Sequence, residues 1–445
     1  MLTCLFENTN AQWTSQASGF STPNRGCEIV TAINKKVSWA EAYEGGCPFC
    51  SPITEFTRTT DGGENWVAGS ITEYPDDYLL GLFPVTKDVA YAITVDYSLS
   101  NERILKTKDG GTTWTLQNTS AWLYNVIYFF NKQDGIVCGG TNGKMKILIT
   151  QNGGKNWVKV PKANLPEFNS TEELYVFSGT GIGDTFWAAT TDARILKSID
   201  KGKHWNIYET PATGEGAFED VNNLRMRDGL HGLLGFHDQL FRTSDGGETW
   251  SELNPQGSWF TNGLSYVPGT DATWVSTGGD VTSSYGALNG IGSSYSIDDG
   301  ETWILIDTGI DHLGVDFTDE TTGYCGGFNT DNENGGMFKY NGAPLRHAAQ
   351  EENSSVLNLN FYPNPVSQSA IISFQSGVTQ NISLQIFDTQ GRLIRTLAYE
   401  VMSEGTHSLT WNARDESGNA VSGGIYFLRM ETESEVKTIQ LSVIK

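Results

Sequence analysis

No apolar run in the 445-residue sequence reaches the roughly 18 residues that a membrane-spanning helix needs. Basic residues are also scarce, because 29 Lys and Arg stand against 52 Asp and Glu, giving a formal net charge of −23. Residues 1–340 hold 42 of the acids against 22 basic residues, whereas residues 357–445 hold 8 against 6. So acidic a chain is poorly suited to bind nucleic acid. Its charge fits a protein kept soluble outside the cell, or acids that line a cation or sugar site.

Familiar catalytic and metal-binding signatures are missing as well. The sequence has no Ser/His/Asp order, no zinc-ligand spacing and no phosphate-cradling glycine loop. Residues Asn329 to Glu333 carry oxygen-bearing side chains on alternate positions, as calcium ligands do, but the glycine of a calcium loop is not at the sixth position. We therefore predict no cofactor, with Ca²⁺ at this acidic loop as the alternative.

The six cysteines are few for a chain of this length. Cys27, Cys47 and Cys50 lie close together and, in an exported protein, predict a local disulfide, either Cys47 with Cys50 or one of these with Cys27. The CPFC spacing can also indicate thiol redox chemistry, but it lacks the βαβ context of that motif. Cys138 and Cys325 occupy equivalent places after apolar strands, so we expect both to be buried.

An eight-residue pattern that returns six times organises the first three quarters of the sequence. The copies are TTDGGENW (Thr59 to Trp66), TKDGGTTW (Thr107 to Trp114), TQNGGKNW (Thr150 to Trp157), SIDKGKHW (Ser198 to Trp205), TSDGGETW (Thr243 to Trp250) and SIDDGETW (Ser296 to Trp303). The hydroxyl and the carboxylate two residues later can accept hydrogen bonds from the backbone of a tight turn, and the second glycine favours positive φ. Each copy therefore predicts a hairpin turn, with its Trp starting the returning strand.

The spacing of the copies predicts the fold. Their acidic or amide positions, Asp61, Asp109, Asn152, Asp200, Asp245 and Asp298, follow one another at intervals of 43 to 53 residues. Periods of roughly 40 to 50 residues with about four short strands are typical of propeller blades. Trp13 starts a strand that no turn precedes, and Met337 to Tyr340 forms a strand that no turn follows. Pairing these two strands would close a ring of seven blades over residues 12–340.

The pattern resembles the Asp-box, the bacterial neuraminidase (BNR) repeat, with Asn152 replacing Asp in one copy. The chain is most similar to single seven-bladed Asp-box propellers such as the photosystem II assembly and stability factor family, which implies a binding scaffold. Sialidases share the repeat, but they use three arginines and an Arg-Ile-Pro motif that this sequence lacks, and Arg25, Arg225 and Arg227 alone are left without a repeat position. Sialidase chemistry is therefore not expected. Xyloglucan-hydrolysing enzymes pair two such propellers, and this chain has room for one.

A ligand face is predicted opposite the repeat turns, around the mouth of the channel. The aromatic residues expected to bind there, by stacking on sugars or anchoring a protein, are Trp122, Trp259, Tyr78, Tyr124 and His312. The alternative is that the two tryptophans only plug their loops. Asp96, Glu173 and Asp220 are the candidate catalytic acids. Two functions stay open: a binding or scaffold protein for an extracellular glycan or protein, and a polysaccharide hydrolase or lyase, which needs paired acids about 5 to 10 Å apart.

Both ends of the chain indicate export. Residues 1–11 look like the remnant of a secretory signal with cleavage near Ala11, and the rival interpretation is a lipoprotein acylated at Cys4. Residues 341–356 form a polar linker, and residues 357–445 show about seven short strands fit for a small β-sandwich.

The C-terminal segment resembles the type A C-terminal sorting domain of the Bacteroidetes type IX (Por) secretion system. The likeness rests on YPNP at Tyr362 to Pro365, the DTQGR turn, the GGIYFLRM strand and the final strand from Lys437 to Lys445. It implies that the type IX translocon is a partner, and that the protein is secreted or held at the cell surface. A carbohydrate-binding sandwich is the alternative.

Overall fold

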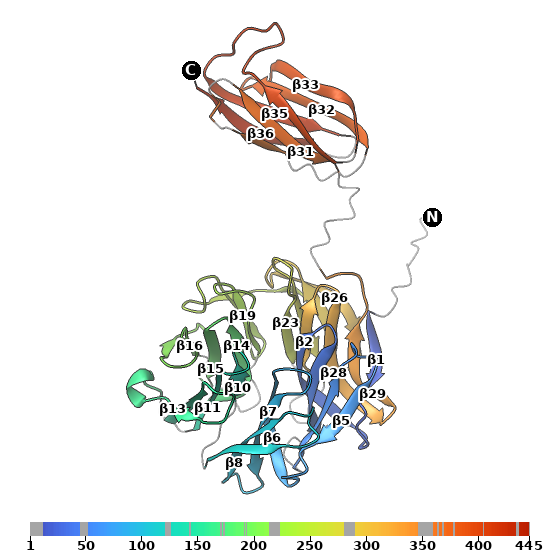
Figure 1. Cartoon of the computed structure of the whole chain (residues 1–445). Coiled ribbons are helices and arrows are strands. Elements are labelled where there is room, and N and C mark those ends of the chain that lie inside the picture. Colours follow the sequence, from blue (N-terminus) through green and yellow to red (C-terminus); the bar gives the residue numbers. More distant parts are fainter. Residues whose placement is uncertain are drawn as a thin grey trace. The chain divides into compact units, whose positions relative to one another are not determined.

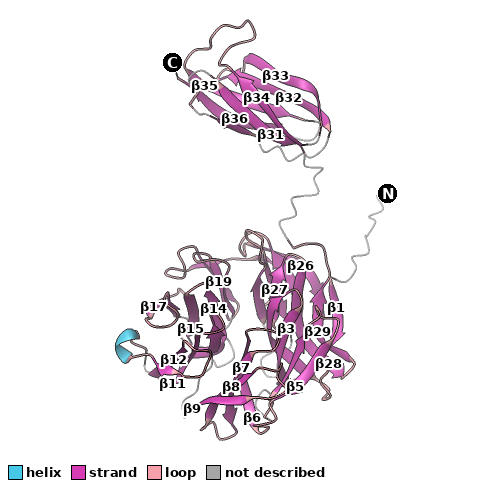
Figure 2. Ribbon diagram, viewed as in Figure 1, coloured by secondary structure: helices cyan, strands magenta, loops and turns pink. Residues whose placement is uncertain are grey.

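The structure is a computed structural model of the chain. It describes residues 12–44, 52–120, 126–141, 144–169, 171, 174–190, 192, 194–212, 223–279, 290–345, 359–362, 365–366, 369–376, 379–403, 405–432 and 436–444. The chain divides into two compact units, residues 1–347 and 348–445. The division falls inside the linker predicted at residues 341–356, and both units are built from antiparallel strands (Figure 2).

The described part of the first unit forms seven four-stranded blades. Blades one to six follow chain order. Blade one is β2 (Arg25–Asn34), β3 (Val37–Glu44), β4 (Glu55–Thr59) and β5 (Trp66–Ser70), and blade two is β6 (Asp77–Pro84), β7 (Ala90–Asp96), β8 (Glu102–Thr107) and β9 (Thr115–Ser120). Blade three is β10 (Val126–Phe129), β11 (Gly135–Thr141), β12 (Lys144–Thr150) and β13 (Val158–Lys159), and blade four is β14 (Leu174–Ile182), β15 (Thr185–Thr190), β16 (Ile195–Ser198) and β17 (Asn206–Tyr208). Blade five is β18 (Asn223–Met226), β19 (Gly232–Phe236), β20 (Gln239–Thr243) and β21 (Ser251–Leu253), and blade six is β23 (Gly263–Tyr266), β24 (Trp274–Gly278), β25 (Gly292–Ser296) and β26 (Thr302–Thr308). The short strand β22 (Gln256–Gly257) pairs parallel to β26, and a single 3₁₀ turn, η1 (Lys162–Asn164), follows β13.

Blade seven closes the ring as the sequence predicts. It consists of β27 (Val315–Asp319), β28 (Thr322–Asp331), β29 (Asn334–Tyr340) and the N-terminal strand β1 (Trp13–Ala17). β1 pairs antiparallel with β29, in a register that sets Trp13 opposite Tyr340, and the two strands lie side by side in Figure 1. Because the outer strand comes from the opposite end of the domain, the pairing leaves neither β1 nor β29 as a loose end.

The repeat turns have one common geometry. In all six copies the Ser or Thr hydroxyl accepts a 2.9 Å hydrogen bond from the backbone N–H of the glycine four residues later. That glycine has φ between +80° and +88°, which a residue with a Cβ rarely adopts. The Asp or Asn Oδ1 accepts a bond of 2.9 to 3.0 Å from the backbone N–H four residues after it. Hydrogen bonds from the Asn65 side chain and backbone lower the pKa of Asp61 to about 2.

The second strands of the blades carry the core. Trp39, Trp187 and Trp274 are fully buried there, and so are the free thiols of Cys138 and Cys325, as predicted. The prediction that Cys27 joins a disulfide is corrected, because it is a free thiol in the structure. Cys27 packs between blades one and seven, in a cluster that includes Phe20, Ala40 and Met337. Cys47 and Cys50 lie outside the described residues.

The second unit is a β-sandwich, as the strand pattern predicts. One sheet has the order β30 (Asn360–Tyr362), β31 (Ala370–Ser376), β34 (Gly405–Trp411), and the other has the order β33 (Leu393–Met402), β32 (Gln380–Asp388), β35 (Gly424–Glu431), β36 (Val436–Val443). Apolar side chains from both sheets share one core, with Trp411 1% exposed. In the part of the chain that the structure describes, no helix is long and apolar enough to cross a membrane.

Candidate functional site

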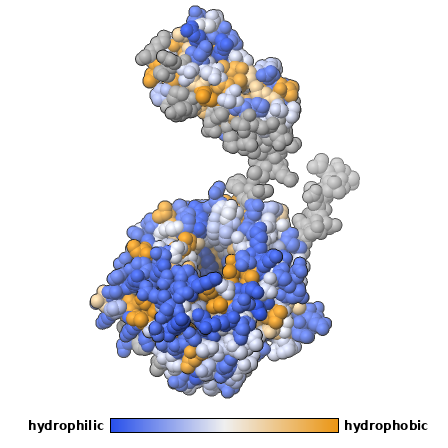
Figure 3. All heavy atoms as spheres, viewed as in Figure 1, coloured by the Kyte–Doolittle hydropathy of each residue, from blue (hydrophilic) through white to orange (hydrophobic). Residues whose placement is uncertain are grey.

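The face opposite the repeat turns is built from two sets of loops. Each repeat turn joins the third strand of a blade to the fourth, so the loops that join strands two and three, and successive blades, lie at the other end. The first strands of the blades contact one another in a closed ring around the centre. Figure 3 shows a hollow in the middle of the propeller, surrounded mainly by hydrophilic residues. Loops around such a hollow are the usual binding region of a propeller.

Asp96, a predicted catalytic acid, lies on this face but is committed to its own turn. Its carboxylate accepts hydrogen bonds from the Ser98 hydroxyl at 2.8 Å, the Ser100 backbone N–H at 2.9 Å and the Asn101 side chain at 2.6 Å. These bonds, led by the one from Asn101, hold the pKa of Asp96 well below its usual range. A carboxylate so stabilised is a poor general acid. It acts instead as the cap of the turn between β7 and β8.

That turn presents an aromatic platform, which we define as Tyr97 together with Tyr78 beneath it. Tyr97 is 70% exposed, and its ring stacks on that of Tyr78 with centroids 6.2 Å apart and planes 20° apart. Tyr78 is buried, so its predicted ligand role is corrected to that of a support. Leu99, in the same turn, is 55% exposed. The exposed ring is the one that sequence reasoning missed, although its place directly after Asp96 at a strand end was a usable signal.

Two further residues predicted to bind ligand are buried. Trp259 is 6% exposed and packs against Trp303 and Gly235, so the interpretation that it plugs its loop is correct and its predicted ligand role is not. His312 is fully buried between the rings of Trp13 and Phe338. Its Nε2 lies 2.8 Å from Asp307 Oδ2. Trp259 and His312 are buried because apolar and aromatic groups fill the space between the sheets of adjacent blades.

The remaining predicted positions on this face are not placed. Trp122, Tyr124, Glu173 and Asp220 lie outside the described residues.

The channel cluster consists of Arg225, Ser265 and Asp316, from the first strands of blades five, six and seven. Asp316 Oδ2 accepts a 2.8 Å hydrogen bond from the backbone N–H of Ala32 in blade one, and Oδ1 accepts a 3.4 Å bond from the Ser265 hydroxyl. Burial raises the pKa of Asp316 to about 6, against the opposing effects of the Ala32 bond and of Arg225. Since blade six separates blades five and seven, the mutual influence of Arg225 and Asp316 acts across the channel.

Several other charged groups near this face are paired or buried. Arg103 Nη1 lies 2.6 Å from Asp77 Oδ2, and Arg25 Nε lies 2.6 Å from Glu55 Oε2. Glu41, on β3, is 8% exposed, and its Oε2 has no hydrogen-bond partner among the described residues. Burial, with a smaller contribution from the charge of Glu28, raises the pKa of Glu41 to about 8.

The acidic loop from Asn329 to Glu333 uses its polar atoms to hold the chain. The Asn329 amide donates to the Phe20 and Thr22 carbonyl oxygens, and its Oδ1 accepts from the Arg25 backbone. Asp331 Oδ1 accepts a hydrogen bond from the Glu333 backbone N–H. Among the described residues, no three His, Cys, Asp or Glu side chains are grouped to hold a metal.

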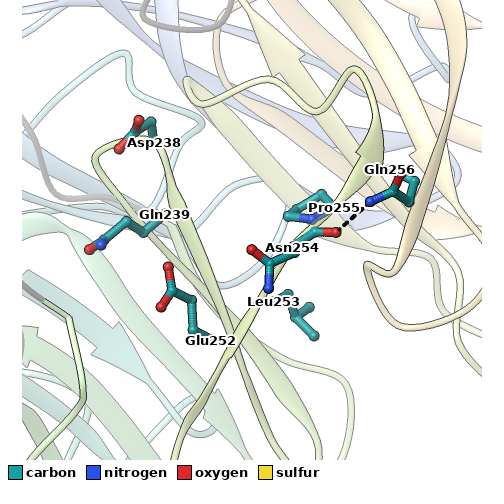
Figure 4. Close-up of a pocket in the computed structure, with 7 residues that line it drawn as sticks. All are labelled: Asp238, Gln239, Glu252, Leu253, Asn254, Pro255 and Gln256. Carbon is teal, nitrogen blue, oxygen red and sulfur yellow. Dashed lines mark hydrogen bonds between the residues drawn. The ribbon is translucent and has the colours of Figure 1, made fainter.

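A shallow, open pocket of about 380 Å³ lies at the rim of blade five, on the same face. Figure 4 shows its lining, which comes from the turn before β20 and its first residue, from the end of β21 and from the segment that follows β21. The lining residues are Asp238, Gln239, Glu252, Leu253, Asn254, Pro255 and Gln256. Leu253 is the single large apolar side chain of the lining, and the other groups are mainly polar. A ligand in this pocket would therefore bury little apolar surface. For that reason the pocket is less suited to anchor a ligand than the aromatic platform.

Comparison with known proteins agrees with the fold. The model of the FlgD Ig-like domain family matches residues 364–435, within the C-terminal sandwich. No curated protein matches the sequence. Among solved structures, YCF48 from Cyanidioschyzon merolae is similar, with a TM-score of 0.51 and 14% identity over 74% of this chain and 99% of that one.

Two further structures are similar at lower scores. YCF48 bound to a D1 peptide has a TM-score of 0.49 at 14% identity over 76% of this chain and 99% of that one. The GH74 enzyme of Niastella koreensis has a TM-score of 0.49 at 15% identity over 97% and 75%. Likeness at these identities speaks to fold alone. The chain is a β-propeller followed by a β-sandwich, as predicted.

Proposed function

We propose that the protein is an extracellular binding protein whose Asp-box propeller holds a glycan on the face opposite the repeat turns. The observation that supports this most is the aromatic platform. A tyrosine ring that is stacked from below and fixed by a capped turn loses little freedom on binding, which makes it an effective anchor. Ser98, Ser100 and Asn101 lie in the same turn as the ring, and a surface with both an aromatic face and polar groups suits a sugar, which has both apolar faces and hydroxyls.

Binding is favoured over hydrolysis by the condition of three of the acids on the described part of the face; Asp238 and Glu252, in the pocket of blade five, are exposed carboxylates there. Asp96 caps a turn, Asp77 pairs with Arg103, and Glu41 is buried. A glycosidase needs one carboxylic acid and one carboxylate, both open to the substrate. Hydrolysis or lyase chemistry with Glu173 and Asp220 remains the second candidate. A binding protein for a polypeptide is the outcome if glycans fail to bind.

The platform is tested by Tyr97→Ala in the full chain on a glycan array, with affinities measured for every glycan bound. We expect the substitution to weaken binding about tenfold or more, because it removes the exposed anchor. Tyr399→Ala is the matched control, since Tyr399 is 82% exposed but lies in the C-terminal sandwich. Equal affinities for the two variants would remove the platform from the site. Products released in the same wells would favour the hydrolase candidate.

We also propose that residues 357–445 direct export through the type IX translocon, which places the propeller outside the cell. The resemblance of this segment to type A sorting domains supports the proposal. A reporter fused to residues 341–445, with a secretory signal, should reach the surface of a bacterium that has the translocon and accumulate in the periplasm of a strain without it. The same reporter fused to residues 341–356 serves as the control. Export that is independent of the translocon would contradict the proposal.

A further inference from the structure

The channel contains one arginine whose donors are largely unused. Arg225 donates a single hydrogen bond, at 3.0 Å to the backbone carbonyl of its neighbour Leu224, and no described carboxylate forms an ion pair with it. A guanidinium has five N–H donors in a planar fork. Burial lowers the pKa of Arg225, so the channel around it disfavours a charge that the side chain nevertheless carries.

The other arginines of the described propeller are already occupied. Five of them form ion pairs: Arg25 with Glu55, Arg103 with Asp77, Arg194 with Glu209, Arg227 with Asp299 and Arg242 with Glu301. The sixth, Arg58, donates to the Lys87 carbonyl and lies over the Trp39 ring. Of the three arginines that the repeat does not explain, Arg25 and Arg227 are thus structural. Among the described residues, Arg225 has neither an ion-pair partner nor an aromatic ring against its guanidinium.

Asp316, across the channel, feels the charge of Arg225 without forming a direct ion pair with it. Its two oxygens hold the Ala32 backbone and the Ser265 hydroxyl, which fixes the carboxylate to the walls of blades one and six. Enclosed charged groups with unmet donors are costly unless water or an ion satisfies them. Arg225 is only half-buried, so a solute that enters the channel can reach it.

We propose that the channel is a second binding site, separate from the aromatic platform, which takes the carboxylate group of a small monoanion at Arg225. The planar fork of a guanidinium matches the two oxygens of a carboxylate in a bidentate pair. A phosphate dianion would bring a second negative charge close to Asp316 and to a chain of net charge −23, and its binding is therefore disfavoured.

Titration calorimetry on the full chain tests this site, with sodium glucuronate as the probe, glucose as its neutral match and sodium phosphate as the dianion, all at one ionic strength. We expect glucuronate to bind, glucose not to bind, and phosphate to bind more weakly. Arg225→Gln should weaken glucuronate binding about tenfold or more, and Arg225→Lys should weaken it less because it keeps the charge but loses the fork. Arg242→Gln, which breaks a half-exposed pair with Glu301, is the control.

Two readouts separate this site from the alternatives. Arg225→Gln should be at least as stable to denaturant as the parent, because it removes a desolvated charge, whereas a purely structural arginine would lower stability when replaced. Tyr97→Ala should leave glucuronate binding unchanged, so failure of the platform and failure of the channel site are distinguishable. No heat of binding with the parent chain, or equal binding by parent and Arg225→Gln, would overturn the proposal.

Discussion

Replacing Glu41 by Gln is expected to raise the stability of the propeller at pH 9 and to leave it nearly unchanged below pH 5. Burial raises the pKa of Glu41 to about 8 in the folded protein, against an ordinary value of 4.5. Between these two values the unfolded chain has released the proton that the folded chain retains, so the stability due to the neutral form is lost as the pH rises. Gln keeps the shape of the neutral acid and cannot ionise, which removes this loss.

The expected effect is large because no described residue neutralises the charge of Glu41. Arg25, the basic residue nearby in blade one, is held by Glu55 at 2.6 Å and Glu44 at 3.7 Å. A pKa difference of this size corresponds to several kcal/mol at most, and relaxation around the charge reduces it, so we expect a gain of about 2 to 4 kcal/mol at pH 9. Urea unfolding of the parent and the variant at pH 5 and pH 9 measures it.

The exposed Glu64, in the first repeat turn, supplies the control. Glu64→Gln should change the free energy of unfolding by less than about 0.5 kcal/mol at either pH. If the parent and Glu41→Gln lose stability equally between pH 5 and pH 9, the carboxyl of Glu41 is already ionised at neutral pH and the interpretation of its burial is wrong.

The repeat turns and the ring closure were predictable because their information is local or periodic. A turn such as Thr59 to Trp66 is held by hydrogen bonds among its own residues, so its sequence alone determines its shape. The ring closure was predictable because the repeat leaves one unpaired strand at each end of the propeller, and pairing these two strands completes the seventh blade. Trp13 opposite Tyr340 confirms it.

The site was less predictable because burial depends on contacts between blades. Trp259 and Tyr97 both lie in loops of the same face, yet one ring fills the gap beside Trp303 and the other is exposed. Glu41 lies in the strand VSWAEAYE, in which seven of the eight residues are buried, so alternation could not reveal its environment. The unused hydrogen-bond donors of Arg225 could not be predicted, because the sequence does not show which arginines form ion pairs.

Trp13→Ala is expected to lower the free energy of unfolding, because Trp13 anchors the strand that closes the ring. Trp13 is 5% exposed and packs against the rings of Phe317 and Tyr340 at 5.9 and 5.4 Å. Its indole N–H donates to the Ser293 hydroxyl at 2.9 Å, and Ser293 in turn donates to Asp307 at 2.6 Å, which ties the closing strand to blade six. Truncation of so large a buried ring should cost about 3 to 5 kcal/mol of unfolding free energy, measured in urea.

The matched variant is Trp250→Ala, which removes a repeat tryptophan of similar burial from blade five. Its loss should cost a comparable amount and keep unfolding cooperative, because the strands on both sides are joined by short turns. In Trp13→Ala, by contrast, β1 keeps its pairing with β29 and the contacts of Gln16 with Gly63 and Trp66 but loses its tie to blade six, so we expect hydrogen exchange in β1 and β29 to accelerate before exchange elsewhere. If hydrogen exchange accelerated uniformly in both variants, the pairing of β1 with β29 would open only when the whole propeller unfolds.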